Sequence, residues 1–189
     1  MNAVAPFAGG LPSWLEHETQ RLLGLCVDHD SATSDDTSWT LQTLDRLSSE
    51  VGPTQAAVAF TDYNRNNVTL EFTDGSWKVS GVFDLMECYY GDPLATAARE
   101  FAMALDDDVR IAEAFLQAYV SQISIEAQVE RRLQRGLIYE RLLVWEYFTR
   151  LEHKSKSLPK VPGHTLRDWL GSYLDAASSA MSTTSTVDL

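Results

Sequence analysis

The stretch that decides the fold runs from Ala59 to Pro93 and reads AFTDYNRNNVTLEFTDGSWKVSGVFDLMECYYGDP. Three short runs in or beside it have the apolar or alternating patterns of strands: 56–61, 68–72 and 77–83. Between the last two runs stands Thr73-Asp74-Gly75-Ser76, which is typical of a β-hairpin turn. The sequence therefore predicts a small central sheet, with a loop between its first two strands and a hairpin turn between the last two.

Helical patterns precede this stretch. Ser13 is followed three residues later by Glu16, which is the capping-box pattern of a helix start. The polar segment 30–38 is expected to be a loop, with Ser38 as the cap of a second helix. Gly52-Pro53 is expected to end that helix.

Helical patterns also follow the stretch. Asp92-Pro93 combines a favoured N-cap residue with proline at the first helical position. Three helices are expected after it, at about 93–105, 108–122 and 125–153. Thr165 and Asp168 then form a further capping-box pattern before a last amphipathic helix. The fold class is therefore α+β and mostly helical.

Length and composition favour a single domain. The chain has 189 residues, of which 44% are hydrophobic and 22% charged, as in an ordinary globular protein. We expect a flexible lead at 1–12, one folded domain at 13–181 and a disordered polar tail at 182–189.

The charge balance limits the classes of partner. With 15 basic and 27 acidic residues the formal net charge is −12, which disfavours nucleic acid and suits a cationic small molecule or a basic protein surface. No apolar run reaches the roughly 18 residues of a membrane span. The N-terminal residues lack the pattern of a signal peptide, and only two cysteines, Cys26 and Cys88, are present. We therefore expect a cytoplasmic protein.

Three oxygen-bearing side chains stand at the ends of the expected strands. Asp62 follows the first strand, Asn67 lies five residues later, and Asp84 ends the third strand. An aspartate held in this way can accept the proton of an attacking hydroxyl, and an amide oxygen with a second carboxylate can hold Mg²⁺ on nucleotide phosphates. Taken singly, each residue is also a common turn former.

Taken together, the segment resembles the aminoglycoside phosphotransferase and choline kinase group of small-molecule kinases. In that family a His-Gly-Asp-x-x-x-x-Asn loop is followed by a hairpin, a Gly-Val-Ile-Asp-like strand end, and Gly-Asp-Pro opening a helix. The counterparts here are Phe60-Thr61-Asp62 with Asn67, Gly81-Val82-Phe83-Asp84, and Gly91-Asp92-Pro93. The resemblance covers nearly all of 13–175. It implies a protein-kinase-like C-terminal lobe with a small central β-hairpin region and a C-terminal helical bundle.

The resemblance implies phosphoryl transfer from ATP to a small-molecule or peptide hydroxyl. Asp62 would be the catalytic base, and Asn67 and Asp84 would be the Mg²⁺ ligands. Asp92 has a sufficient role as a helix cap. The sequence departs from the family pattern at Phe60 and Thr61, which replace His and Gly. It departs again at Thr96, which stands where the family often has Asp.

The family's N-terminal lobe, with its glycine-rich loop and phosphate-pairing lysine, has no counterpart that we recognise here. None of the four lysines lies in the first 77 residues: they are Lys78, Lys154, Lys156 and Lys160. We therefore expect a partner chain or a homodimer to cover the surface where that lobe would pack. The alternative is a non-catalytic kinase-fold subunit, a pseudokinase that binds or assists in a modification or biosynthetic complex.

Overall fold

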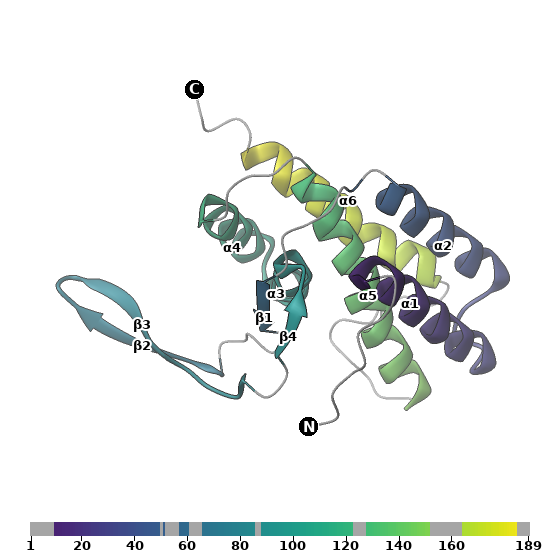
Figure 1. Ribbon diagram of the computed structural model, residues 1–189, viewed down its shortest axis with the longest axis horizontal. Coiled ribbons are helices and arrows are strands. Elements are labelled where there is room, and N and C mark those ends of the chain that lie inside the picture. The colour runs from purple at the N-terminus through teal and green to yellow at the C-terminus, as the bar shows by residue number, and fades with distance from the viewer. Residues whose placement is uncertain are drawn as a thin grey trace.

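A computed structural model describes residues 10–49, 51, 57–60, 66–85, 88–122, 128–151 and 164–184. Figure 1 shows a helical body and a hairpin that extends away from it. The described elements are, in chain order, α1 (Gly10–Asp28), α2 (Ser34–Ser49), β1 (Ala57–Phe60), β2 (Val68–Thr73), β3 (Ser76–Val82), β4 (Cys88–Gly91), α3 (Pro93–Asp107), α4 (Val109–Gln122), α5 (Val129–Arg150) and α6 (Leu166–Thr184). The mostly helical α+β class is as the sequence predicts. None of the helices in these ranges is both long and apolar enough to cross a membrane.

The centre of the helical body is α5, against which α1, α2, α3 and α6 pack. Its apolar residues recur at three- and four-residue spacing, so that they form one continuous buried face. Leu133, Leu137 and Leu142 on that face are completely buried. Burial of these side chains against four helices supplies the main hydrophobic stabilisation of the body.

The strands form two separate antiparallel pairs, so the prediction of a single small sheet is wrong in its connections. Strand β1 pairs with β4, in the register Ala57 to Gly91 and Phe60 to Cys88, and not with β2. Strand β4 was not expected, because four residues are too short to show a clear period. The β1–β4 ribbon packs on α3, and it therefore links the start of the central stretch to its end.

The hairpin of β2 and β3 is confirmed, and its turn has the predicted residues. Asp74 and Gly75 both have positive φ values, 56° and 79°, as a two-residue type I′ turn requires. The cross-strand pairs include Leu70 with Val79 and Phe72 with Trp77. Directly opposed side chains share a face, so one face of the hairpin is apolar and its members are Val68, Leu70, Phe72, Trp77, Val79 and Val82.

Helix starts were predicted where the capping pattern is unambiguous. Asp92 caps α3, since its side chain accepts a hydrogen bond from the Leu94 N–H at 3.0 Å. Thr165 and Asp168 form the expected reciprocal box at the start of α6, with distances of 3.1 and 3.2 Å. This helix continues to Thr184, and residues 185–189 of the expected tail lie outside the described residues.

Two other predicted starts are wrong. Helix α1 begins at Gly10, three residues before the expected cap Ser13, and residues 1–9 of the expected lead lie outside the described residues. Helix α2 begins at Ser34 and not after Ser38. The reason is a second capping box, in which the Thr33 N–H donates to Asp36 Oδ2 at 2.9 Å and the Asp36 N–H donates to Thr33 Oγ1 at 3.1 Å.

Asp36 also joins two helices that are far apart in the sequence. While Oδ2 serves the cap of α2, Oδ1 accepts a hydrogen bond from the backbone N–H of Arg167, in the first turn of α6, at 2.9 Å. Burial by itself would raise the pKa of Asp36, but the hydrogen bonds from the Thr33 side chain, the Thr33 N–H and the Arg167 N–H outweigh it. The pKa of this carboxyl group is therefore below its usual value.

We expect Asp36→Ala to lower the free energy of unfolding by about 1–2 kcal/mol, because two helix starts lose a cap. A lowered pKa stabilises the fold above the unfolded-state value near pH 4, and this contribution disappears as the pH falls through the folded-state pKa. Chemical denaturation at pH 7 and at pH 3 should therefore show a smaller difference between wild type and variant at pH 3. The control is Asp35→Ala in the same turn, where the side chain is exposed. Equal effects of the two substitutions would contradict the double cap.

Candidate functional site

The base of the hairpin brings two of the three predicted site residues together. Asn67 precedes β2, and its carbonyl oxygen accepts a hydrogen bond from the Phe83 N–H at 2.8 Å. Asp84 is the next residue after Phe83, so that Asn67 and Asp84 leave the same end of the ribbon. The register that pairs Val68 with Val82 fixes this approach.

Asp84 has an unusual backbone. Its φ is 54°, in the left-handed region that few non-glycine residues adopt, and Asp is among those that tolerate it best. Such conformations are held in place by the structure around them and recur at binding and catalytic sites. The Asp84 side chain is exposed, whereas Asn67 is half-buried. The carboxylate is thus available to a ligand.

Asp62, the predicted base, lies outside the described residues. The elements beside it are described. Phe60, the last residue of β1, pairs with Cys88, the first residue of β4. The segment that carries Asp62 therefore starts from a strand that is paired to the segment following Asp84. The β1–β4 pairing therefore positions Phe60, the last described residue before Asp62.

A carboxylate oxygen and an amide oxygen are suitable donors for Mg²⁺. Asn67 and Asp84 offer this donor set at one end of the ribbon. Among the described residues no group of three His, Cys, Asp or Glu side chains lies together in the way that would hold a metal ion without further ligands.

Asp92, the residue between β4 and α3, is held in place by contacts with two helices. Besides capping α3, its carboxylate forms a two-point ion pair with Arg132 of α5: Nη2 donates to Oδ1 at 2.6 Å and Nε donates to Oδ2 at 3.0 Å. Both side chains are buried. Tyr119 adds a hydrogen bond from its hydroxyl to the Pro93 carbonyl oxygen at 3.0 Å. The junction between β4 and α3 is thus tied to α4 and α5.

Sequence reasoning found Asp92 and missed Arg132. A signal existed, since Arg132 and Arg135 lie next to Val129, Leu133 and Gly136 on the apolar side of α5, where a cation needs a partner. Burial lowers the pKa of Arg135, while the nearby Asp92 and Glu16 act in the opposite direction.

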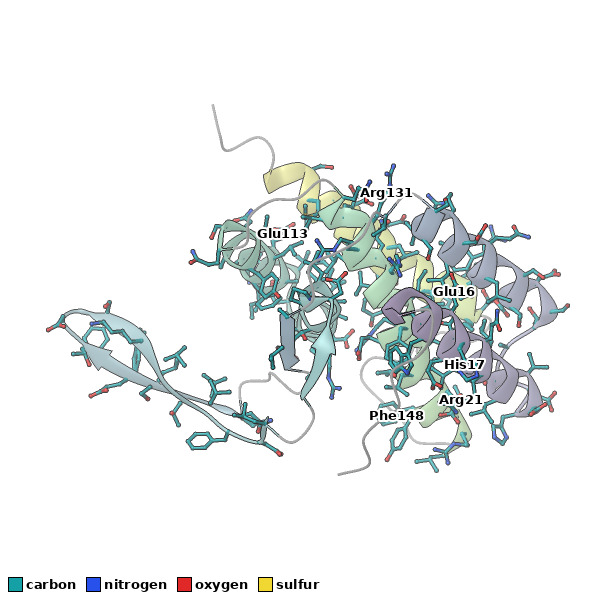
Figure 2. The ribbon with its side chains drawn as sticks, in the orientation of Figure 1. Glu16, His17, Arg21, Glu113, Arg131 and Phe148 are labelled. Carbon is teal, nitrogen blue, oxygen red and sulfur yellow. The ribbon has the colours of Figure 1, made fainter. Side chains whose placement is uncertain are left out.

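The hairpin presents its apolar face to solvent. Leu70, Phe72, Trp77 and Val79 are all exposed, Trp77 to 69% of its surface. Phe72 and Trp77 pack edge to face, with ring centroids 5.2 Å apart. Figure 2 shows that the hairpin, with its side chains, extends away from the helical body. An isolated two-stranded ribbon is marginally stable at best, so a covered apolar face would stabilise it.

Comparison with known proteins places these features in a family. The model of the phosphotransferase enzyme family matches residues 2–134, which is more than half of the chain. The chain belongs to this phosphotransferase family. The match spans Asp62, Asn67 and Asp84 and extends to the Arg132 anchor. No curated protein and no solved structure matches the chain.

Proposed function

We propose that this protein transfers the terminal phosphoryl group of ATP to a hydroxyl group of a small molecule or peptide. The observation that carries the proposal is the membership of the phosphotransferase family, together with the hydrogen bond that sets Asn67 beside the Asp84 end of the ribbon. In this proposal Asn67 and Asp84 hold Mg²⁺, and Asp62 accepts the proton of the acceptor hydroxyl.

Each residue has a separate chemical task. Mg²⁺, bound together with the nucleotide, would neutralise part of the negative charge of the phosphates. Asp84 contributes a full negative charge from a fixed backbone, and Asn67 contributes a neutral oxygen from the opposite strand. Asp62 orients the acceptor hydroxyl, which matters because phosphoryl transfer depends mainly on positioning and electrostatics. The formal net charge of −12 favours a cationic acceptor.

We further propose that a partner chain or a second copy covers the apolar face of the hairpin and supplies the phosphate-binding cation. Two observations support this. The apolar face is exposed although it adjoins Asp84. In addition, no lysine precedes Lys78 in the sequence. The partner's cation would neutralise charge on the phosphates that Asn67 and Asp84 do not reach.

A non-catalytic role as a kinase-fold accessory subunit is the second candidate. The observation that favours it is the pair Phe60 and Thr61, which replaces the His-Gly of the family pattern directly before Asp62. Binding of Mg²⁺ and nucleotide is a step that the first proposal requires and the second does not.

The test is calorimetric titration of the full chain with ATP, with and without Mg²⁺. We expect Mg²⁺-dependent binding that Asp84→Asn weakens at least about tenfold, since a charged ligand is lost. Asn tolerates the left-handed backbone, so the variant keeps its geometry. The matched control is Asp74→Asn in the turn at the far end of the hairpin, which we expect to bind as the wild type does. Equal binding by both variants would contradict the proposed site. Absence of binding at millimolar ATP would favour the accessory role or a site that is complete only with the partner chain.

A further inference from the structure

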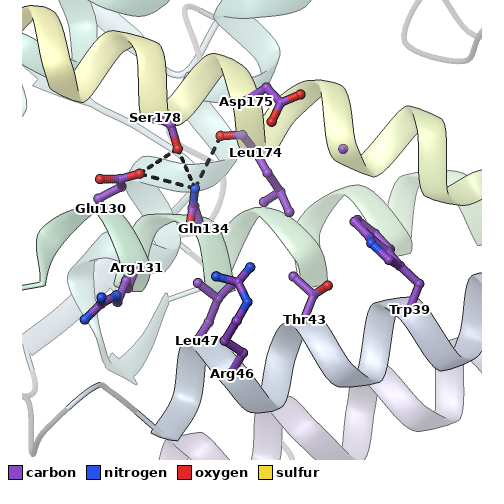
Figure 3. A pocket seen from close by; sticks show the side chains of 11 residues that line it. Trp39, Thr43, Arg46, Leu47, Glu130, Arg131, Gln134, Leu174, Asp175 and Ser178 are labelled. Carbon is purple, nitrogen blue, oxygen red and sulfur yellow. Dashed lines mark hydrogen bonds between the residues drawn. The ribbon is translucent and has the colours of Figure 1, made fainter.

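A second candidate site lies in the helical body, away from the hairpin. Helices α2, α5 and α6 enclose a pocket of about 430 Å³ (Figure 3). This volume is in the range of small-molecule sites, roughly 300–1,000 Å³. The walls include Arg46 from α2, Gln134 from α5, and Gly171 and Asp175 from α6. None of the residues proposed for phosphoryl transfer lines it.

One wall of this pocket is held rigidly by hydrogen bonds between α5 and α6. Gln134 Nε2 donates to Ser178 Oγ at 2.9 Å and to the Leu174 carbonyl oxygen at 3.3 Å. Ser178 Oγ donates to Glu130 Oε1 at 2.6 Å. The dashed lines in Figure 3 show this network between α5 and α6. The wall is therefore fixed without a ligand, and the Glu130 carboxylate is already engaged by the protein.

Two charges in the pocket are not engaged in this way. Neither the Arg46 guanidinium nor the Asp175 carboxylate has an ion pair or side-chain hydrogen bond with any residue that the structure describes. They line the same pocket from α2 and α6, and Arg46 extends from α2 toward Gln134 in Figure 3. One exposed cation from α2 and one exposed anion from α6 are thus offered to a ligand, and Arg131 of α5 adds a second cation to the lining. Their chemistry fits a molecule that carries both charges.

The α6 wall of the pocket contains a helical glycine that packing does not require. A Cβ built on Gly171 would meet no atom within 4 Å. Glycine is among the weakest helix formers, so alanine or leucine would suit α6 better by propensity. Because Gly171 has no side chain, the space beside it remains part of the pocket. Gly24 in α1 also has open space around its Cβ direction, but it does not line the pocket.

We propose that this pocket binds a small zwitterionic molecule of the amino acid class, with its anionic group at Arg46 and its cationic group at Asp175. The proposal goes beyond the proposed phosphoryl transfer and is independent of it. A purely anionic ligand would be opposed by the net charge of the chain and by Asp175, and a purely cationic one would be repelled by Arg46 and Arg131. Pairing both charges favours the zwitterion over either single-charge analogue.

The experiment uses the full chain and a length series of zwitterions: glycine, 4-aminobutanoate and 6-aminohexanoate. Hexanoate and hexylamine serve as the single-charge analogues. We expect calorimetry to show that one zwitterion binds at least about tenfold more tightly than either analogue. Gly171→Leu should weaken that binding at least about tenfold, and Gly24→Leu should leave it unchanged. Arg46→Gln and Asp175→Asn should each remove the preference for the zwitterion.

Thermal denaturation checks that the variants fold. Both glycine substitutions place a strong helix former in open space, so neither should lower the Tm. The proposal is overturned if no zwitterion binds better than hexanoate and hexylamine, or if folded Gly171→Leu binds as well as Gly24→Leu. Preferential binding of hexanoate alone would also overturn it and would assign the pocket to simple anions. Because the probes contain no nucleotide, failure of Mg²⁺-ATP binding leaves this test unaffected.

Discussion

Replacing Arg132 with Met is expected to lower the free energy of unfolding by about 3–5 kcal/mol. The methionine side chain fills similar space but leaves the Asp92 carboxylate buried without its two-point partner at 2.6 and 3.0 Å. A buried charge that loses its ion-pair partner is far more costly than a lost surface ion pair. Urea denaturation followed by circular dichroism measures the change. The control is Arg131→Met, because Arg131 is the exposed neighbour in the same turn of α5.

A double-mutant cycle separates the ion pair from the helix cap. Asp92→Asn removes the charge and keeps a side-chain oxygen that can accept from the Leu94 N–H. If the cost arises from the pair, Asp92→Asn combined with Arg132→Met should destabilise by at least about 1 kcal/mol less than the sum of the single changes. Strict additivity, or an Arg131→Met effect as large as that of Arg132→Met, would contradict the anchor.

The ion pair between Asp92 and Arg132 also shows which parts of the fold the sequence could predict. The cap at Asp92 and the box at Thr165 and Asp168 depend on residues two or three positions apart, so a local pattern is sufficient. The partner of Asp92 lies 40 residues away on another helix, and no local pattern indicates it. The pairing of β4 with β1 is likewise non-local, since it connects the two ends of the central stretch.

The candidate site was predictable in part for a related physical reason. A two-residue turn fixes the register of a hairpin, and the register fixes which residues leave its open end together. Counted from Asp74-Gly75 alone, Val68 would pair with Gly81. A register shift between Thr69 and Leu70 moves this pairing by one residue to Val82, and so the turn predicts that Asn67 approaches the end of β3 but not the exact register that sets it opposite Phe83. The role of Asp62 stays a prediction, because it lies outside the described residues. The pocket of Arg46 and Asp175 depends on how three helices pack, which periodicity alone does not give.

A second buried charge cluster joins α3, α5 and α6 and leads to the other large prediction. Asp106 accepts from Arg141 Nη1 at 3.2 Å and from the Tyr173 hydroxyl, and Arg141 lies over the Tyr173 ring at 5.3 Å from its centroid. Burial, followed by the hydrogen bond to Asp106, raises the pKa of Tyr173, so its hydroxyl stays protonated and donates. Arg141 is only 2% exposed. The cluster is thus a buried cation held by one carboxylate.

We expect Asp106→Ala to lower the free energy of unfolding by about 3–5 kcal/mol, because it leaves the Arg141 guanidinium buried without its carboxylate. Tyr173→Phe should cost only about 1 kcal/mol, since the ion pair and the ring contact remain and one hydrogen bond is lost. The matched control is Asp107→Ala at the exposed neighbouring position. Chemical denaturation of the three variants tests this order. If Asp106→Ala were no more destabilising than Tyr173→Phe, the stabilisation would come from the aromatic packing of α6 and not from the buried charge pair that links it to α3.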